Sequence, residues 1–312
     1  MSARMASTMT VGLAMVTVAA CSGGQREAES PAPGAGYVES VEAWRAKHEA
    51  DYRQDWVSIA GLHFLEPGTF RVGSAATNDI VLAAAVPSTI GRVIVADGRI
   101  RYEPEPGVPV LQKGQPVTGS IVLKEPGSPP ADELTIDDVR LVIHESGDRL
   151  SLRVRDPKGK LAQGFVGFAW FPIDPNYRVV GRFIADQTPK KMAVPNTFGD
   201  NDAYATEGVI EFALHGQTVR LRPFTTRPKR FYIVFRDASS GVETYETARF
   251  LYADLRDDGT TVLDFNEAYN PPCSFNPYTT CPIPLKENKL PVKVLAGEKA
   301  YPVHVPLPAP AS

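Results

Sequence analysis

The sequence predicts a mainly β fold, either an antiparallel β-sandwich or barrel-like sheets, with one N-terminal helix and few other helices. Three observations support this prediction. Proline contributes 28 of 312 residues, near twice its usual ~5% share, and proline disfavours long helices. Segments that alternate apolar and polar residues recur at intervals of roughly ten residues. No strand is followed by a long helix, which argues against a parallel sheet.

The first residues have the features of an export signal. Arg4 provides a positive charge, and Met9 to Val18 form an apolar stretch that is shorter than the about 20 residues of a membrane span. Val18-Ala19-Ala20-Cys21 is similar to a bacterial lipobox, whose cysteine is acylated and becomes the first mature residue. We therefore expect residues 1–20 to be a signal peptide and Cys21 to be the lipidation site. An ordinary secreted protein with an accidental cysteine is the alternative.

Acylation would anchor the protein to the cell envelope, with the lipid bilayer as its partner through Cys21. Two or three acyl chains, at about 0.8 kcal/mol per buried methylene, hold a protein on a membrane for long times. Residues 21–36 read CSGGQREAESPAPGAG, a composition typical of a flexible tether. In a Gram-negative host, Ser22 after the cysteine predicts the outer membrane, facing the periplasm.

The charge of the chain argues against nucleic acid as a partner. Removal of residues 1–20 takes away one Arg, which leaves 32 Lys and Arg against 36 Asp and Glu, or −4 with His neutral. No long stretch is dominated by one sign, so no basic patch is available for phosphate backbones. The length suffices for one large domain or two smaller ones.

One helix is expected near the N-terminus of the folded part. Ser40 is a suitable N-cap, and Val41, Trp44 and His48 fall on one face of a helix that ends near Arg53.

The rest of the chain predicts β-hairpins. Segments 92–96 and 99–103 flank Asp97-Gly98, a pair preferred in two-residue turns because both positions tolerate positive φ. Further hairpins are expected from 139–143 with 150–154, 209–214 with 218–222, and 230–236 with 242–252. We expect the last four strands to form one antiparallel meander.

Two sub-domains are predicted. Residues 37–187 would hold the helix and a first β unit, and residues 188–312 a C-terminal antiparallel β unit. The Pro/Gly-rich region after Asp156 is the alternative position for the break.

Besides Cys21 the chain has two cysteines, Cys273 and Cys281. In an oxidising compartment they are expected to form a disulfide that braces the loop between them. A zinc site is the alternative, and it is disfavoured because no histidine or third cysteine lies nearby. The sequence contains no Gly-x-Ser-x-Gly, no His-Glu-x-x-His and no glycine-rich phosphate loop. We expect neither a metal site nor a cofactor.

Several segments of the C-terminal third together resemble one family. They are Asp237 to Gly241, Thr244-Tyr245, Arg249-Phe250-Leu251, Leu263 to Cys273, Cys281-Pro282, Asn288 and Ala296 to Lys299. This pattern resembles the domain of unknown function 1684 family. Earlier matches, from Trp44-Arg45 to Phe165-x-Gly167-x-x-Trp170-Phe171-Pro172, extend the resemblance over about residues 40–301. The family name implies no activity.

The same segments supply the candidate ligand-binding residues, which are Tyr245, Arg249, Asp264, Asn266, Tyr269, Asn270 and Glu298. A loop braced by prolines and a disulfide would hold these groups rigidly, as a binding site requires. Arg249 is expected to face Asp264 across one step of the ladder. The alternative is a buried polar network in which Asp264 and Asn266 bind loop amides and Arg249 is the counter-ion.

Three functions are compatible with this sequence. We favour the binding of a small polar or glycan-like ligand by a membrane-anchored domain. The second is an extracytoplasmic hydrolase that uses Asp264 or Glu298 as acid or base. The third is an envelope scaffold protein, recognisable by an exposed apolar patch or an open strand edge.

Overall fold

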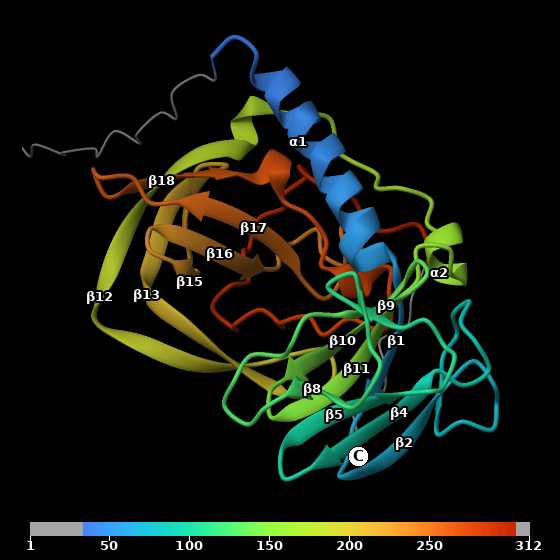
Figure 1. Ribbon diagram of the computed structural model, residues 1–312. Helices are drawn as coiled ribbons and strands as arrows, with labels where there is room; N and C mark the ends of the chain where they lie inside the picture. Colours follow the sequence, from blue (N-terminus) through green and yellow to red (C-terminus); the bar gives the residue numbers. More distant parts are fainter. Residues whose placement is uncertain (1–33, 304–312) are drawn as a thin grey trace, which may run out of the picture.

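Figure 1 shows the computed structural model of the chain, which describes residues 34–303. The predicted signal peptide, the lipidation site Cys21 and residues 21–33 of the tether lie outside the described residues. Within residues 34–303 the fold is mainly β, with antiparallel sheets and few helices, as the sequence predicts. Every helix in this range is too short or too polar to serve as a membrane span.

Two facing sheets form the N-terminal lobe. The first has the order β1-β11-β10-β9-β6-β7, with bounds β1 Ile59–Phe64, β6 Leu111–Gln112, β7 Gln115–Pro116, β9 Leu134–Ile136, β10 Val139–Ser146 and β11 Arg149–Arg155. The second has the order β3-β2-β4-β5-β8, with bounds β2 Gly68–Gly73, β3 Ile80–Val81, β4 Gly91–Ala96, β5 Arg99–Pro104 and β8 Ile121–Lys124. Buried apolar side chains of both sheets share one core, for example Val93 and Leu141.

Two further sheets form the C-terminal lobe. One has the order β14-β13-β12-β18, with bounds β12 Arg178–Pro195, β13 Asn201–Leu214, β14 Gln217–Leu221 and β18 Thr260–Asp264. The other has the order β15-β16-β17, with bounds β15 Phe224–Arg227, β16 Arg230–Phe235 and β17 Arg249–Asp254. A second core, with Phe212 and Leu251 among its members, lies between them.

Three of the four predicted hairpins are present with the predicted strands. In the fourth, the second strand begins at Arg249 instead of residue 242, because residues 236–248 form a long loop. The predicted meander is wrong. Asp97 and Gly98 have φ values of 53° and 72°, as the turn between β4 and β5 requires. The hairpins β13–β14 and β16–β17 belong to different sheets. The chain leaves the first of these sheets at Pro223, which has no N–H to continue a ladder, and β15 then starts the next sheet.

The long hairpin β12–β13 joins the two lobes. Strand β12 passes through the predicted boundary at 187/188, and the sheets change instead after β11, in the alternative region that follows Asp156. At the tip of the hairpin, the Asp200 carboxylate accepts hydrogen bonds from Arg149 Nε at 2.6 Å and from Ser146 Oγ at 2.7 Å. The hairpin is therefore pinned to the turn between β10 and β11.

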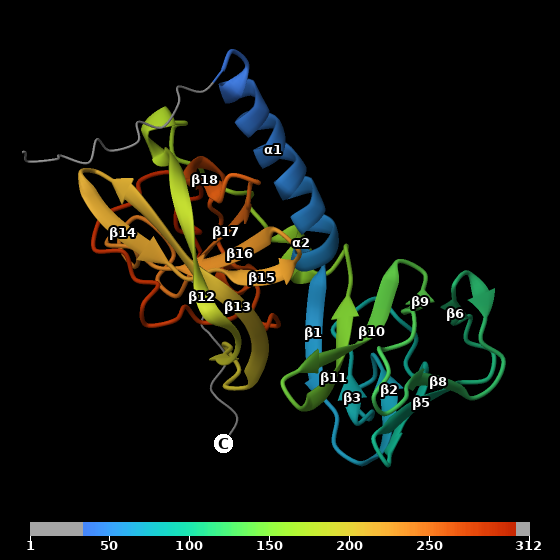
Figure 2. The same ribbon diagram turned by 90° about the vertical axis from the view of Figure 1, so that its left-hand side faces the viewer.

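Helix α1, Tyr37–Tyr52, continues into a π-helical turn, η1, Arg53–Val57. It begins earlier than the sequence predicts, because Gly36 with φ 85° is the N-cap and Ser40 lies inside the helix, donating to the Tyr37 carbonyl. The helix lies across the C-terminal lobe and leads into β1 of the other lobe (Figure 2). The remaining helical segments are α2 Lys160–Gln163, η2 Pro175–Tyr177, η3 Phe265–Glu267 and η4 Pro272–Ser274.

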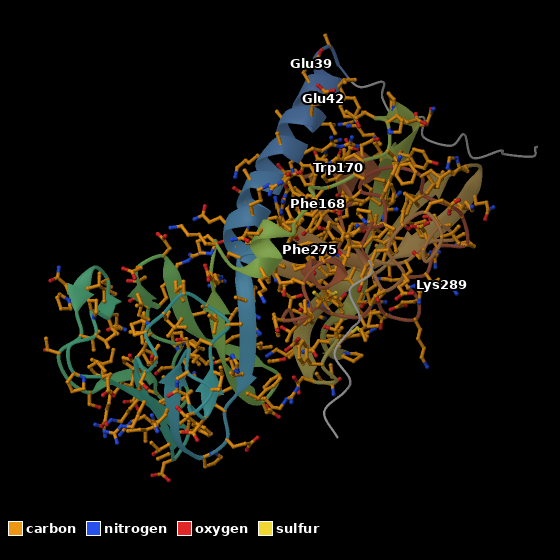
Figure 3. All side chains as sticks on the ribbon, turned by 90° about the vertical axis from the view of Figure 1, so that its right-hand side faces the viewer. Glu39, Glu42, Phe168, Trp170, Phe275 and Lys289 are labelled. Carbon is orange, nitrogen blue, oxygen red and sulfur yellow. The ribbon has the colours of Figure 1, made fainter. Side chains whose placement is uncertain are left out.

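Aromatic side chains attach α1 to the C-terminal lobe. Figure 3 shows Phe168, Trp170 and Phe275 along the side of α1 that faces this lobe. The ring centroids lie 6.0 Å apart for Trp44 and Trp170, and 5.7 Å apart for His48 and Phe168. Edge-to-face and tilted ring pairs of this kind stabilise beyond the area they bury. The helix is thus fixed in place by a third core cluster.

The chain after Cys281 has no regular strand within the described residues, yet much of it is buried. Gly297 is held tightly there, with φ 75°, and a Cβ at this position would lie 2.2 Å from the Ala268 carbonyl oxygen. Its own carbonyl accepts a hydrogen bond from Phe171 N–H at 2.9 Å. The position therefore requires glycine both for its backbone conformation and for space.

We predict that Gly297→Ala destabilises the protein far more than Gly216→Ala. Gly216 has nearly the same φ, 73°, but open space around the added methyl group, so its substitution should cost about 1–2 kcal/mol from backbone conformation alone. Gly297→Ala should cost about 2 kcal/mol more, because the backbone must move. Denaturant unfolding of the two variants measures the difference, and equal midpoints would refute the tight packing described at Gly297.

Candidate functional site

The predicted site residues do not form one cluster. Arg249 belongs to a buried ion pair, and Asn270 and Glu298 form a second buried group. Asp264 and Asn266 lie at the edge of a cavity under α1. Tyr245 and Tyr269 lie beside two other cavities.

Arg249 is fully buried, and its partner is Asp237. The Nη1 atom lies 3.0 Å from Asp237 Oδ2 and donates to the Val294 carbonyl at 2.8 Å, while Nη2 donates to the Ala296 carbonyl. Burial lowers the pKa of Arg249, and the charge of Asp237 opposes this shift. The predicted pairing of Arg249 with Asp264 is wrong, because their strands β17 and β18 belong to different sheets. Arg249 fixes the C-terminal segment and does not face a cavity.

Glu298 is also fully buried. Its carboxyl oxygens accept hydrogen bonds from the backbone N–H and from the side-chain amide of Asn270, both at 2.8 Å. Desolvation raises the pKa of Glu298 to about 8. Neither side chain lines the cavities beside Asp264, Tyr245 or Tyr269. These two groups therefore act within the protein interior.

Asp264 and Asn266 have a different position, at the N-terminal end of α1. The phenol of Tyr37 donates to Asp264 Oδ2 at 2.8 Å, and Arg178 Nε lies 3.7 Å from the same oxygen. Asn266 Nδ2 donates to Asp264 Oδ1 at 3.1 Å and to the Asp174 carbonyl at 2.8 Å. The backbone carbonyl of Asn266 accepts a hydrogen bond from Arg45 of α1. Asp264 lines the cavity, whereas Asn266 is buried behind it.

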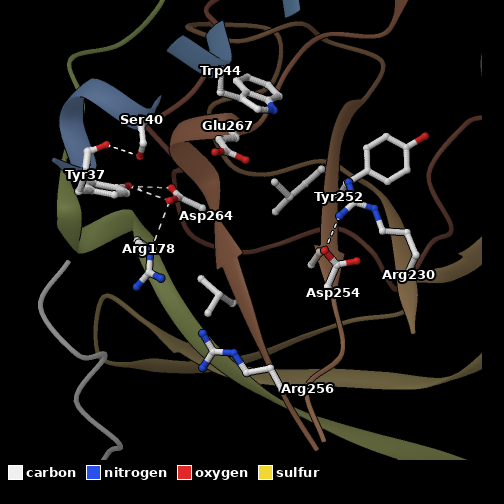
Figure 4. Close-up of a pocket in the computed structure, with 13 residues that line it drawn as sticks. Tyr37, Ser40, Trp44, Arg178, Arg230, Tyr252, Asp254, Arg256, Asp264 and Glu267 are labelled. Carbon is white, nitrogen blue, oxygen red and sulfur yellow. Dashed lines mark hydrogen bonds and ion pairs between the residues drawn. The ribbon is translucent and has the colours of Figure 1, made fainter. Parts of the chain in front are cut away.

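The cavity beside Asp264, which we call the polar compartment, has a volume of about 430 Å³ and is within the usual size range of small-molecule sites. Figure 4 shows its lining. Six of its residues are acidic or basic, namely Arg178, Arg230, Arg256, Asp254, Asp264 and Glu267, and Tyr37, Ser40, Trp44 and Tyr252 are also part of its wall. Its residues come from α1 and from both sheets of the C-terminal lobe.

Some of these charged groups form ion pairs with each other, and others have no partner among the described residues and can bind a ligand. Arg230 and Asp254 form an ion pair at 2.7 Å. Within residues 34–303, the guanidinium of Arg256 and the carboxyl group of Glu267 make no hydrogen bond or ion pair. Desolvation, followed by the negative charge of Asp264, raises the pKa of Glu267 to about 7. The compartment thus presents both free donors and a carboxyl group that is partly protonated at neutral pH.

The two tyrosines and the two cysteines lie apart from this compartment. The Tyr245 phenol donates to the Cys273 carbonyl at 3.4 Å, and Tyr269 pairs with Phe250 through two backbone hydrogen bonds. Cys273 and Cys281 are buried free thiols, so the predicted disulfide is absent from this structure. The sulfur of Cys281 instead accepts a hydrogen bond from Cys273 N–H at 3.3 Å. The described residues contain no group of three His, Cys, Asp or Glu side chains arranged to hold a metal.

The prediction from sequence did not include most of the lining of the polar compartment. Arg178 faces Asp264 in the ladder between β12 and β18, two segments whose pairing the sequence does not reveal. Tyr37 reaches the site because α1 starts there. Glu267 can be recognised in the sequence as a candidate, since it follows Asp264 by three residues in the same turn. Glu298 is instead the candidate glutamate named from the sequence.

Comparison with known proteins relates part of the chain to a family. The sequence model of the family described as "Protein of unknown function (DUF1684)" matches residues 163–299, so this region is similar to that family. A search of curated proteins found no match. A solution NMR structure of an uncharacterized protein of Haloarcula marismortui is similar, with 30% identity over 44% of this chain and 78% of that chain and a TM-score of 0.38.

We predict that Arg249→Met lowers stability by about 3–5 kcal/mol, because it leaves the Asp237 charge buried without a partner. Adding Asp237→Asn should restore a part of this loss, since the remaining group is neutral. Urea unfolding of the single and double variants measures both effects. A normal stability of Arg249→Met would contradict the structural role assigned to this ion pair.

Proposed function

We propose that the C-terminal lobe binds a small polar or glycan-like ligand in the polar compartment. The proposal rests chiefly on one observation, a concave site of about 430 Å³ that is lined by ionisable groups with unused hydrogen-bonding capacity. Hydroxyl groups of a sugar suit such a lining because each can donate to a carboxylate and accept from a guanidinium. Three guanidinium groups and three carboxyl groups share the compartment, which favours a polar ligand over a strongly charged one.

The proposed location of this activity is the cell envelope. The lipobox-like segment that ends at Cys21 supports an acylated anchor, and residues 21–36 have the composition of a tether. The lipid bilayer would then be a partner, and a Gram-negative host would place the domain on the outer membrane, facing the periplasm. In that oxidising setting the adjacent thiols of Cys273 and Cys281 would close into a disulfide.

We predict that Arg256→Gln weakens ligand binding by about tenfold. Loss of one charge-assisted hydrogen bond costs about 1.5–3 kcal/mol, and 1.4 kcal/mol is a factor of ten. Arg220→Gln is the matched control, because Arg220 is an exposed arginine that pairs with Glu211 outside the compartment. Calorimetric titration with neutral and acidic mono- and oligosaccharides measures the effect. If neither Arg256→Gln nor Arg178→Gln changes the binding affinity, the ligand binds outside the polar compartment.

A second candidate function is glycoside hydrolysis, which the pair Glu267 and Asp264 favours. Both carboxyl groups line the same compartment, and their surroundings differ: Asp264 accepts hydrogen bonds from Tyr37 and Asn266, whereas Glu267 is desolvated and has a pKa near 7. Two carboxyl groups in unlike environments are the arrangement that divides acid and base roles. Glu267 would protonate the departing oxygen while Asp264 assists the incoming water. Glu298, the earlier candidate, is too buried to act.

If the site is hydrolytic, Glu267→Gln should abolish cleavage of an oligosaccharide whose leaving group is a sugar, not an activated nitrophenol, while the fold stays intact. The rate should fall as the pH rises through about 7, because the acid form of Glu267 is lost there. Glu287→Gln, a change at an exposed carboxylate outside the compartment, is the control. Product analysis by chromatography measures turnover, and activity retained in Glu267→Gln would exclude this role.

A further inference from the structure

A second cavity lies beneath α1, beside the polar compartment. It has a volume of about 550 Å³, and we call it the aromatic compartment. Eight aromatic side chains are part of its wall, namely Trp44, Tyr52, Trp56, Tyr204, Tyr232, Phe250, Tyr252 and Tyr269. Protein interiors seldom leave voids larger than a water molecule, so a space of this size is not a packing defect of the aromatic cluster.

The two compartments adjoin and share part of their walls, and we call them together the cleft. Trp44 of α1 and Tyr252 of β17 line both of them. Along the helix, Tyr37 and Ser40 line the polar compartment, and His48 and Tyr52 the aromatic one. These positions follow the spacing of one helical face, so a single face of α1 forms the roof of the whole cleft.

Tyr252 is held rigidly where the two compartments meet. Its side chain is 40% exposed although it lines both cavities. The Tyr232 ring stacks on it with the centroids 5.0 Å apart, and the guanidinium of Arg230 lies over the ring, 5.0 Å from its centroid. A rigid, partly exposed side chain of this kind loses little conformational entropy when its free edge contacts a ligand.

The aromatic compartment also offers polar groups at the edges of its rings. Within residues 34–303, the hydroxyl groups of Tyr204 and Tyr232 have no hydrogen-bond partner. Burial raises the pKa of Tyr204 to about 12 and raises that of Tyr232 well above its usual value, so both remain neutral phenols that can donate and accept. An alkyl chain would leave these hydroxyl groups unpaired, at a cost.

A pyranose ring satisfies both requirements. Its C–H faces contact the negative faces of aromatic rings, and its equatorial hydroxyl groups reach the phenols at the edges. The adjoining polar compartment suits the hydroxyl groups of a second ring. We propose that the cleft binds a glycan of at least two linked rings, one in each compartment, that crosses the junction between Trp44 and Tyr252. This inference rests on the proposed function and specifies its ligand class.

The number of sugar units in the oligosaccharide is the variable that tests the proposal. We would titrate the protein with chito-oligosaccharides and cello-oligosaccharides of one to six units by calorimetry. Affinity should rise at least tenfold between the monosaccharide and the di- or trisaccharide, as the second compartment becomes occupied, and should then level off.

Substitution of Tyr204 tests the position of the second ring. Tyr204 lines only the aromatic compartment, so Tyr204→Ala should reduce the affinity for the di- or trisaccharide about tenfold and leave the monosaccharide unchanged. Tyr278→Ala is the control, because this partly exposed tyrosine lies beside another cavity. If Tyr204→Ala lowers the melting temperature, Tyr204→Phe, which removes only the hydroxyl group, replaces it and should show a smaller loss in the same direction.

The outcomes separate this inference from the function on which it rests. The two-ring inference is overturned if oligosaccharides of all lengths bind with equal affinity. It is also overturned if Tyr204→Ala lowers the affinity for the monosaccharide and the trisaccharide equally. Either result leaves a polar monosaccharide site. The absence of binding by every member of both series overturns the inference and the glycan-binding function together.

Discussion

The attachment of α1 to the end of β18 determines whether the cleft exists. The helix precedes β18 by more than two hundred residues, yet Tyr37 donates to Asp264 and Arg45 donates to the Asn266 carbonyl at 3.0 Å. Asn266 continues this network to the Asp174 carbonyl. Together with the aromatic contacts further along the helix, these bonds hold α1 above the sheet β15-β16-β17 and leave a lined space below it. A helix displaced from this position would open both compartments to solvent.

Buried polar groups elsewhere in the lobe support this arrangement without taking part in it. Arg249 and Asp237 anchor the C-terminal segment through the carbonyls of Val294 and Ala296, and Glu298 accepts two hydrogen bonds from Asn270. Such groups are costly to bury, and they are tolerated only when hydrogen bonds compensate for the lost hydration. The C-terminal segment that they fix packs against Ala268 and Phe171, next to the turn that carries Glu267. Glu267 of the polar compartment thus belongs to a loop that these buried groups help to fix.

The sequence predicts individual hairpins better than it predicts which distant strands pair with each other in a sheet. Hairpins such as β4–β5 follow from local rules, because Asp97-Gly98 determines the turn and alternation determines the faces. The pairing of β12 with β18, which brings Arg178 to Asp264, depends on contacts between distant segments that no local pattern encodes. For the same reason Asp264 was identified as a site residue but assigned to the wrong arginine. Glu298 and Arg249 are polar residues in a turn-rich segment, and the sequence does not distinguish such residues when they are buried, as here, from those that face a cavity.

The claim that the cleft under α1 is the ligand site is tested most directly by a crystal structure of the protein soaked with chitotriose or cellotriose. The account predicts sugar density beneath α1, with one ring among Arg178, Arg256 and Glu267 and the next in the aromatic compartment beside Tyr204. Density for a bound trisaccharide on any other surface, with both compartments filled only by water, would contradict it.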